Sequence, residues 1–328
     1  MIASISSGSW KRPMSDLSFG IIGTGSAAES HASAICRQPS ASLTAVRSRR
    51  IEKAREFASR HGSITAYEEV EYLLENRDVD GVVVTSGLDE RAECIRLAVR
   101  SGRPVIASSP IARSYHEAMQ LAALSEEEGA LITPFVTRRY SCGIRFIRNA
   151  IDEGRLGRLM NVSVSYMFDK STSSYEADAE SGSLIMKDGF EALDVMLFLI
   201  GKPRMLSSFS GNIAARSDAE DIFTVSFVAG SAAHGSLSLI ASSSASSFSV
   251  SAVGSEGCCR YENGRLSCMF RNGERIEISD DACGIDAFYS DYISSLFSGT
   301  EAVSKLEDGL LALRVAEAII SASKRIDF

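Results

Sequence analysis

A short apolar segment that runs directly into a glycine-rich turn is the feature that most restricts the fold. Phe19–Gly23 (FGIIG) leads into the sequence GTGSAA, and Ser26–Arg37 then has the spacing of a helix. The pattern G-x-G-x-x-A between a strand and a helix is typical of a dinucleotide-binding β-α unit. In this pattern Gly23 permits the tight turn, Gly25 leaves room for a pyrophosphate and Ala28 lets the helix pack closely. The open alternative is a glycine turn in an α/β protein that binds no nucleotide.

Strand and helix patterns alternate through the first half of the chain. Val79–Thr85 (VDGVVVT) is a continuous run rich in valine, of the kind found in strands buried on both faces. The other expected strands are Leu43–Arg47, Pro104–Ala107 and Ala130–Phe135, and the expected helices are Ile51–His61, Tyr67–Asn76, Glu90–Ser101 and Ser114–Glu128. This alternation predicts βαβ units and hence an N-terminal Rossmann domain with a doubly wound parallel sheet.

Patterns typical of antiparallel sheet replace this alternation after about residue 136. Between Met205 and Ile278, short alternating runs are separated by turn sequences such as Glu262-Asn263-Gly264. The other expected elements are a strand at Leu159–Phe168 and helices at Cys142–Glu153, Gly189–Ile200, Phe288–Phe297 and Leu306–Ser323. We predict an α/β chain with an N-terminal extension at 1–17, the Rossmann domain at 18–136 and, at 137–328, a C-terminal α+β domain with a large open, mostly antiparallel sheet.

Charge and cysteine content exclude several classes of partner. The 34 basic and 42 acidic side chains give a net charge of −8, which repels phosphate backbones and anionic lipid. We therefore expect no nucleic acid and no membrane partner. Seven cysteines, an odd number in a chain without a secretory signal, predict reduced thiols in a cytoplasmic protein. The spacing of Cys258, Cys259 and Cys268 does not fit a zinc site, so we expect no metal.

The end of the second expected strand bears on the choice of cofactor. NAD-binding proteins usually place an acidic residue there to hold the ribose 2′-hydroxyl. This chain instead has the sequence RSRR at positions 47–50, with no carboxylate before Glu52. The Ser48 hydroxyl and the Arg49 guanidinium suit a 2′-phosphate, because arginine offers a planar fork of donors. The segment predicts NADP rather than NAD, unless these arginines merely face water.

Five stretches of the chain resemble the Gfo/Idh/MocA family of NAD(P)-dependent oxidoreductases across nearly its whole length. They are GIIGTGSAAESHASAI, VDGVVVTSGLDERAECIRLAVRSGRPVIASSPIA, RRYSCGIRFIRNAIDEGRLGRL, SGSLIMKDGFEALDVMLFLIGKP and LEDGLLALRVAEAIISASK. The resemblance implies a Rossmann domain and a second domain whose large open sheet often mediates dimers or tetramers. It also implies hydride transfer on sugars, cyclitols and related polyols. On this basis we expect a small-molecule substrate and a homodimer or homotetramer.

The substrate side of the chain departs from the family pattern. Glu90 stands where a histidine is usual, and Thr85-Ser86-Gly87 replaces the common Thr-Pro-Asn. The Glu-Lys-Pro motif appears as Ser108-Ser109-Pro110, and D-x-G-x-H appears as the sequence KDGFE at positions 187–191. The family positions that still match are His31, Arg139 and Asp194. The cofactor half of the pattern is therefore kept, whereas most substrate-side groups are replaced.

These replacements leave few candidates for proton transfer. Lys187 and Glu191 are four residues apart in a segment expected to be one helix, so they would be neighbours on one face and could handle the proton. The alternative is a plain helical ion pair. Ser109 is a further catalytic candidate but has an ordinary hydroxyl. The other candidate cofactor contacts are Ser26, Thr85 and Pro110, and the candidate substrate contacts are Arg139, Tyr166 and Asp188.

Two functions remain open at this point. One is an NADP-dependent oxidoreductase acting on a sugar-like, polyol or related carbonyl compound. The other is a non-catalytic NADP-binding sensor or regulator that has lost the catalytic lysine, aspartate and histidine of the family.

Overall fold

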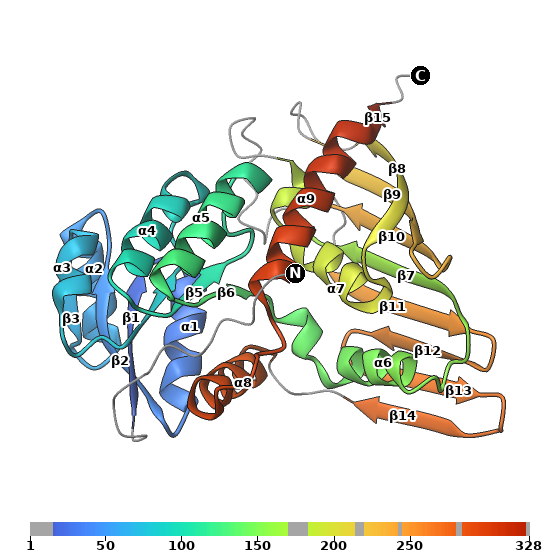
Figure 1. Cartoon of the computed structure of the whole chain (residues 1–328), viewed down its shortest axis with the longest axis horizontal. Helices are drawn as coiled ribbons and strands as arrows, with labels where there is room; N and C mark the ends of the chain where they lie inside the picture. The colour runs from blue at the N-terminus through green and yellow to red at the C-terminus, as the bar shows by residue number, and fades with distance from the viewer. Residues whose placement is uncertain (1–15, 170–182, 214–219, 242–244, 280–283, 326–328) are drawn as a thin grey trace. The chain divides into compact units, whose positions relative to one another are not determined.

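The computed structural model describes residues 16–169, 183–213, 220–241, 245–279 and 284–325 (Figure 1). Most of the expected N-terminal extension lies outside these ranges. The described chain forms two compact units. Met1–Val136 and Ile285–Leu310 make up the first, here called the Rossmann unit, and Thr137–Gly284 and Leu311–Phe328 make up the second, here called the C-terminal unit.

The Rossmann unit contains a six-stranded parallel sheet with the order β3-β2-β1-β4-β5-β6. Its strands are β1 (Leu17–Ile22), β2 (Ala41–Arg47), β3 (Thr65–Tyr67), β4 (Gly81–Val84), β5 (Val105–Ser108) and β6 (Ile132–Phe135). Its helices are α1 (Ser26–Arg37), α2 (Ile51–Arg60), α3 (Val70–Glu75), α4 (Leu88–Arg100), α5 (Tyr115–Glu128) and α8 (Gly284–Ser298). This strand order is that of the doubly wound dinucleotide-binding fold, as predicted.

Burial explains why the central strands form. Every residue of β4 is buried, as expected for a strand that is covered by helices on both faces. The helix expected over Tyr67–Asn76 is wrong at its start, because Thr65–Tyr67 forms β3 and α3 begins only at Val70. The reason is tertiary: Thr65–Tyr67 pairs in parallel with Ala45–Arg47 of β2.

The C-terminal unit contains a nine-stranded sheet with the order β14-β13-β12-β11-β7-β10-β9-β8-β15. Its strands are β7 (Leu159–Met167), β8 (Pro203–Gly211), β9 (Ile222–Ala229), β10 (His234–Ile240), β11 (Ser247–Gly254), β12 (Gly257–Glu262), β13 (Arg265–Phe270), β14 (Arg275–Ser279) and β15 (Ser323–Arg325). Two pairs, β7 with β10 and β8 with β15, are parallel and the other six are antiparallel. The prediction of a large, mostly antiparallel sheet is confirmed.

Helices cover one face of this sheet (Figure 1). They are η1 (Arg138–Tyr140), α6 (Cys142–Asp152), η3 (Leu184–Met186) and α7 (Phe190–Ile200), and α9 (Leu306–Ala322) crosses from the first unit to the second. Helix α7 packs on β7 and β10 and is buried at nine of its eleven residues. The covered face carries apolar residues such as Val162, Val164 and Leu237, which alternate with serines on the opposite face.

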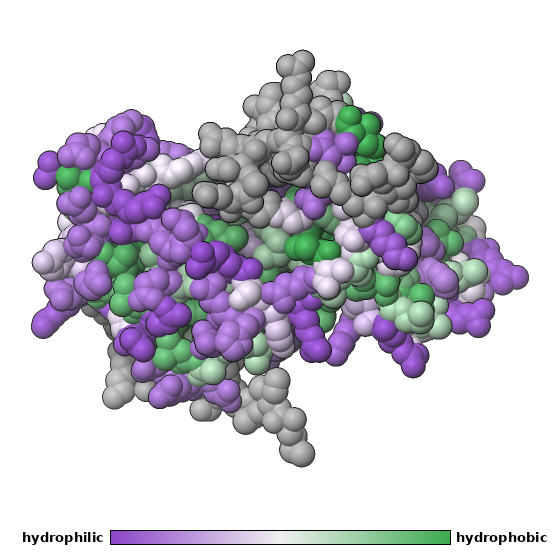
Figure 2. Space-filling model, turned by 90° about the horizontal axis from the view of Figure 1, so that it is seen from above, coloured by the Kyte–Doolittle hydropathy of each residue, from purple (hydrophilic) through white to green (hydrophobic). Residues whose placement is uncertain are grey.

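The surface of the Rossmann unit is mostly hydrophilic on one face. Hydrophilic residues cover most of the face of the Rossmann unit that is seen at the left of Figure 2, with apolar residues scattered between them. No helix in the described ranges is both long enough and apolar enough to cross a lipid bilayer.

Candidate functional site

The turn between β1 and α1 has the geometry that its glycines predict. Gly23 has a φ of +127°, a value that residues with a side chain rarely adopt. A Cβ at Gly23 would lie 2.3 Å from Thr85 Oγ1, so the turn packs directly against the end of β4. The Gly23 amide donates to the Arg47 carbonyl at 2.9 Å, and the Thr85 amide donates to the Ile22 carbonyl at 2.9 Å. The ends of β2 and β4 therefore hold the turn in place.

The N-terminus of α1 is open to a ligand. Gly25 is its N-cap and supplies no side chain to satisfy the first N–H groups of the helix. A Cβ at Gly25 would meet nothing within 4 Å, and Ser26 beside it is exposed. Ala28 is fully buried, which permits close packing of the helix. Helix N–H groups that face open space suit a phosphate, so these residues fit the pyrophosphate of a dinucleotide.

Ser48 and Arg49 follow the end of β2. Ser48 is buried, and its hydroxyl accepts a hydrogen bond from Thr24 Oγ1 at 3.3 Å. The Arg49 side chain is 65% exposed, with Nη1 3.4 Å from Asp89 Oδ2 and Nε 3.8 Å from Glu90 Oε1. An exposed ion pair of this kind contributes only about 0–1 kcal/mol, so Arg49 can turn to another anion at little cost.

Glu90 also has a partner within the Rossmann unit. Its Oε2 accepts a hydrogen bond from Arg47 Nη1 at 3.2 Å, and Arg47 Nε donates to the Glu68 carbonyl at 2.8 Å. The carboxylate that stands where the resemblance implies a histidine therefore neutralises an arginine at the end of β2.

Arg91 joins the loops that follow β4 and β5, a role that the sequence did not reveal. Its guanidinium donates to the carbonyls of Ser86 at 2.9 and 3.1 Å, of Ser108 at 3.3 Å and of Pro110 at 2.6 Å. Burial lowers its pKa to about 10. The Ser109 hydroxyl oxygen is buried without a hydrogen-bond partner among the described residues. Ser109 and Pro110 therefore lie on a loop whose backbone Arg91 holds in place.

The prediction that Lys187 and Glu191 share one helical face is wrong. Lys187 has φ −113° and ψ −108°, far from helical values, and it ends the 3-10 turn η3. Helix α7 begins only at Phe190, so Glu191 lies in its first turn and Lys187 precedes it. A Cβ at Gly189 would lie 2.4 Å from Leu239 Cδ1, so the chain passes close to β10 at this point. The proton-transfer roles of both residues stay predictions.

Glu191 is held by the residues that begin η1. Its Oε1 accepts a hydrogen bond from the Thr137 amide at 3.1 Å, and the Thr137 hydroxyl lies 3.2 and 3.1 Å from its two oxygens. Arg138 Nε lies 3.5 Å from Oε2. The carboxylate therefore has donors at both oxygens instead of the expected lysine partner.

Arg138 lies in a corner formed by two aromatic rings. Its guanidinium carbon is 4.3 Å from the centroid of the Tyr166 ring and 4.2 Å from that of the Phe248 ring. Tyr166 on β7 pairs with Phe248 on β11, and the two rings stand at 75° to each other. Tyr166, a predicted substrate contact, thus belongs to a cluster with Arg138 and Glu191 on the helix-covered face of the sheet.

Arg139 forms a buried ion pair with Asp194. Arg139 Nε donates to Asp194 Oδ2 at 2.8 Å, and Nη2 also contacts Oδ1. The two side chains are 2% and 3% exposed, and the Arg139 guanidinium also lies over the Phe198 ring. This geometry favours a structural role, because a side chain so deeply buried does not reach a substrate directly. A substrate contact by Arg139 stays a prediction that its burial disfavours.

Comparison with known proteins assigns both units. Residues 17–135 match the family model described as "Oxidoreductase family, NAD-binding Rossmann fold", and residues 144–260 match the model of the GFO/IDH/MocA C-terminal domain. The chain belongs to the Gfo/Idh/MocA family of oxidoreductases.

One curated relative in the Gfo/Idh/MocA family matches over nearly the whole chain. Inositol 2-dehydrogenase of Rhizobium meliloti is 25% identical over 92% of this chain and 95% of that protein. Several other curated relatives match over only about half of their own length.

Solved structures of the same fold include two ligand complexes. An oxidoreductase from Agrobacterium radiobacter in complex with NAD⁺, L-tartaric acid and magnesium has a TM-score of 0.86 at 19% identity, over 94% of this chain and 96% of that one. A 3-ketoreductase variant from Actinomadura kijaniata in complex with TDP-benzene and NADP has a TM-score of 0.79 at 20% identity, over 95% and 99%. Neighbours of this fold therefore bind NAD in one case and NADP in the other.

Asp188 occupies the middle of the altered Gfo/Idh/MocA motif, between η3 and α7. Its Oδ2 is buried without a hydrogen-bond partner among the described residues. Burial raises the pKa of this carboxyl, and the positive charge of Lys187 opposes the rise. Of the titratable side chains in the motif, Asp188 is the one with an unengaged buried oxygen.

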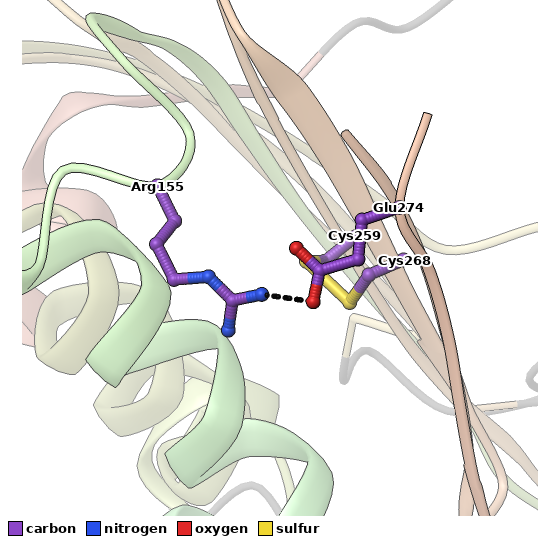
Figure 3. Close-up of a disulfide and its surroundings, with 4 residues drawn as sticks. All are labelled: Arg155, Cys259, Cys268 and Glu274. Atoms are coloured by element: carbon purple, nitrogen blue, oxygen red, sulfur yellow. Dashed lines mark hydrogen bonds and ion pairs between the residues drawn. A yellow bond between two sulfur atoms is a disulfide. The ribbon is translucent and has the colours of Figure 1, made fainter. Parts of the chain in front are cut away.

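The cysteines require a further correction. Cys259 on β12 and Cys268 on β13 are directly opposite each other and form a disulfide (Figure 3), so the prediction that all seven cysteines are reduced thiols is wrong for this pair. The reason lies in the sheet register, which places two side chains nine residues apart on one face. The residues that the structure describes contain no group of three or more metal-ligating side chains.

Proposed function

We propose that this protein is an NADP-dependent oxidoreductase that transfers hydride to or from a sugar-like, polyol or related carbonyl substrate. Membership of a family of NAD(P)-dependent sugar and polyol oxidoreductases supports the reaction class. The observation that carries the proposal is the open, uncapped N-terminus of α1 beside Gly25, which fits a dinucleotide. Nothing in the comparisons favours the alternative of a non-catalytic sensor.

The choice of NADP rests on Ser48 and Arg49. In a Rossmann unit the end of β2 lies near the adenine ribose, and Arg49 is exposed there with only a weak ion pair to Asp89. A 2′-phosphate would offer Arg49 a doubly charged acceptor and would replace that pair. NADH lacks this phosphate and would gain nothing from Arg49.

Proton transfer must accompany hydride transfer. In the oxidation direction a C–H bond of the substrate alcohol breaks with its electron pair going to the nicotinamide, while the hydroxyl proton goes to a base. We assign this base to Asp188, because burial raises its pKa and leaves Oδ2 unengaged. Glu191 then orients Arg138 instead of moving a proton, and Lys187 and Ser109 remain secondary candidates. In the reduction direction the same carboxyl returns the proton.

A homodimer or homotetramer is part of the proposal. The face of the nine-stranded sheet opposite the helices carries rows of small hydroxyls, with Ser163 between Ser236 on β10 and Ser251 on β11. These side chains are small and only half-exposed, so a second sheet could approach closely over these central strands. Light scattering on the purified protein tests the assembly. A cytoplasmic location stays a prediction.

Nucleotide titration tests the cofactor assignment. Calorimetry with NADPH and NADH should give tighter binding of NADPH, and Arg49→Ala should remove most of this preference. Arg49→Asp should lower NADPH affinity further. Arg55→Ala is the matched control, because Arg55 is an exposed arginine on the neighbouring helix α2. If Arg49→Ala lowered the affinity for NADPH and for NADH equally, Arg49 would not recognise the 2′-phosphate.

Turnover tests the enzymatic assignment. A panel of sugars, polyols and their oxidised forms should show NADP-linked absorbance changes at 340 nm. Asp188→Asn should abolish turnover while leaving NADPH binding within about twofold, since the amide cannot accept the proton. Cofactor binding without turnover on any member of the panel would favour the sensor.

A further inference from the structure

The Arg138 corner has the geometry of an anion-binding site within the C-terminal unit. Tyr166 and Phe248 contact the guanidinium through their ring faces. Because the two rings stand at 75° to each other, the guanidinium can lie flat against only one of them, and the N–H groups that point toward neither ring remain able to donate. The only carboxylate paired with Arg138 among the described residues is Glu191, at 3.5 Å.

Comparison with Arg155 shows how Arg138 differs from a structural arginine. Arg155 also lies over two rings, those of Phe146 and Phe270, and its side chain is 29% exposed against 28% for Arg138. Arg155 Nη2, however, donates to Glu274 at 2.9 Å (Figure 3). The Arg138 side chain donates no hydrogen bond within the described residues, although solvent reaches it.

Glu191 limits the charge that the corner accepts. Its carboxylate lies beside the Arg138 guanidinium and is held there by Thr137. An incoming anion therefore meets one positive and one negative group. Glu191 would repel a phosphate dianion more strongly than it would repel a carboxylate monoanion. A carboxylate carries one negative charge, and its two oxygens match the planar fork of donors on the guanidinium.

We propose that Arg138 binds the carboxylate of a polyhydroxy acid, so that the substrate class of this oxidoreductase is sugar acids and not neutral sugars. The two rings fix the position of the guanidinium, and the N–H groups that point toward neither ring donate to the two carboxylate oxygens. This assignment names the substrate of the proposed function and rests on it. Arg138 acts here as a specificity-determining residue, separate from the proton-transfer carboxyl.

Matched pairs of probes test the assignment by direct binding. D-Gluconate and D-glucitol differ only in a carboxylate against a CH₂OH group, and D-glucuronate and D-glucose form a second pair. Binding of each to the full-length protein saturated with NADPH is measured by ligand-observed NMR, which detects millimolar affinity. The variants are Arg138→Met, which removes the charge, Arg138→Lys, which keeps the charge but not the fork, and Arg155→Met as the control.

The expected result is that the wild-type protein binds each acid about tenfold more tightly than its neutral counterpart. Arg138→Met should abolish this difference, Arg138→Lys should retain part of it, and Arg155→Met should retain all of it. An unchanged preference in Arg138→Met, or no preference in the wild-type protein for either pair, overturns the proposal. If Arg138→Met does not fold, a full preference retained in Arg138→Lys overturns the role of the fork.

Two further measurements distinguish a carboxylate site from a phosphate site and from a failure of the proposed function. D-Glucitol 6-phosphate binding more tightly than D-gluconate would overturn the carboxylate assignment in favour of a phosphate. NADPH binding is measured in parallel. Its absence would contradict the proposed function, whereas NADPH binding without acid preference contradicts only the assignment of Arg138.

Discussion

Arg139 and Asp194 form an ion pair that is almost completely buried, with Arg139 Nε donating to Asp194 Oδ2 at 2.8 Å. The pair connects η1 to α7, and these elements also carry Arg138 and Glu191. It therefore fixes the backbone on which the candidate substrate site is built.

Asp194→Ala should be strongly destabilising. The substitution leaves a buried guanidinium without its counter-ion, which typically costs about 3–5 kcal/mol of unfolding free energy. The double variant Arg139→Met/Asp194→Leu removes both charges and should recover most of this loss. Urea unfolding of the wild type, Arg139→Met, Asp194→Leu and the double variant measures the coupling, and Asp194→Ala is unfolded alongside them. A mild effect of Asp194→Ala, with no recovery in the double variant, would contradict the buried-pair account.

Asp89→Asn should raise the affinity for NADPH. Asp89 is the carboxylate closest to Arg49, and it competes with a 2′-phosphate for that guanidinium. Removing one exposed negative charge should tighten NADPH binding about twofold to fivefold at low salt and leave NADH unchanged. Calorimetry at two salt concentrations checks this, since the gain should shrink as salt rises. Equal changes for both nucleotides would point to a general effect on the Rossmann unit.

His31 should make the protein sensitive to acid. Its ring is fully buried against Tyr289, with Nδ1 2.7 Å from the Tyr289 hydroxyl, and burial lowers its pKa to about 3 from the ordinary value of 6.5. The unfolded chain therefore binds a proton near pH 6.5 that the folded chain binds only near pH 3. The contribution of His31 to stability is complete above pH 6.5 and declines by up to about 1.4 kcal/mol per pH unit as the pH falls towards 3.

The pH dependence of unfolding tests this account. His31→Gln should flatten the stability profile between pH 6 and pH 4, as measured by urea unfolding, even if the variant is less stable at pH 7. His116→Gln is the control, because His116 is exposed on helix α5, where its ring hydrogen-bonds with Gln120. A profile with the same slope in wild type and His31→Gln would show that another group titrates.

The Cys259–Cys268 disulfide should be detectable by thiol counting. With the disulfide formed, protein denatured without reductant should expose five of its seven thiols, and reductant should restore all seven. Opening the short loop that the bond closes should lower the free energy of unfolding by about 2–3 kcal/mol. Cys94→Ala is the control for a buried cysteine outside the bond. Seven thiols without reductant would show that the bond does not form in solution.

Local patterns were sufficient for most of the architecture. The apolar run before Gly23, the valine-rich run at Val79–Thr85 and the alternating strands after Met205 predicted a Rossmann unit and an antiparallel sheet. The reason is that the apolar pattern of a strand and the conformational freedom of a glycine can be recognised within a few consecutive residues. The motif G-x-G-x-x-A likewise determined where a dinucleotide can bind, because its turn and helix N-terminus are built from consecutive residues.

The substrate-side chemistry was decided by contacts between residues far apart in the chain. Spacing along the chain predicted that Lys187 and Glu191 share one helical face. The backbone at Lys187 is not helical and separates η3 from α7. Glu191 instead contacts Thr137 and Arg138. The Arg138 corner needs Tyr166 and Phe248 on neighbouring strands of one sheet. Spacing along the chain cannot predict such pairings, because sheet register and burial bring these residues together only when the whole unit folds.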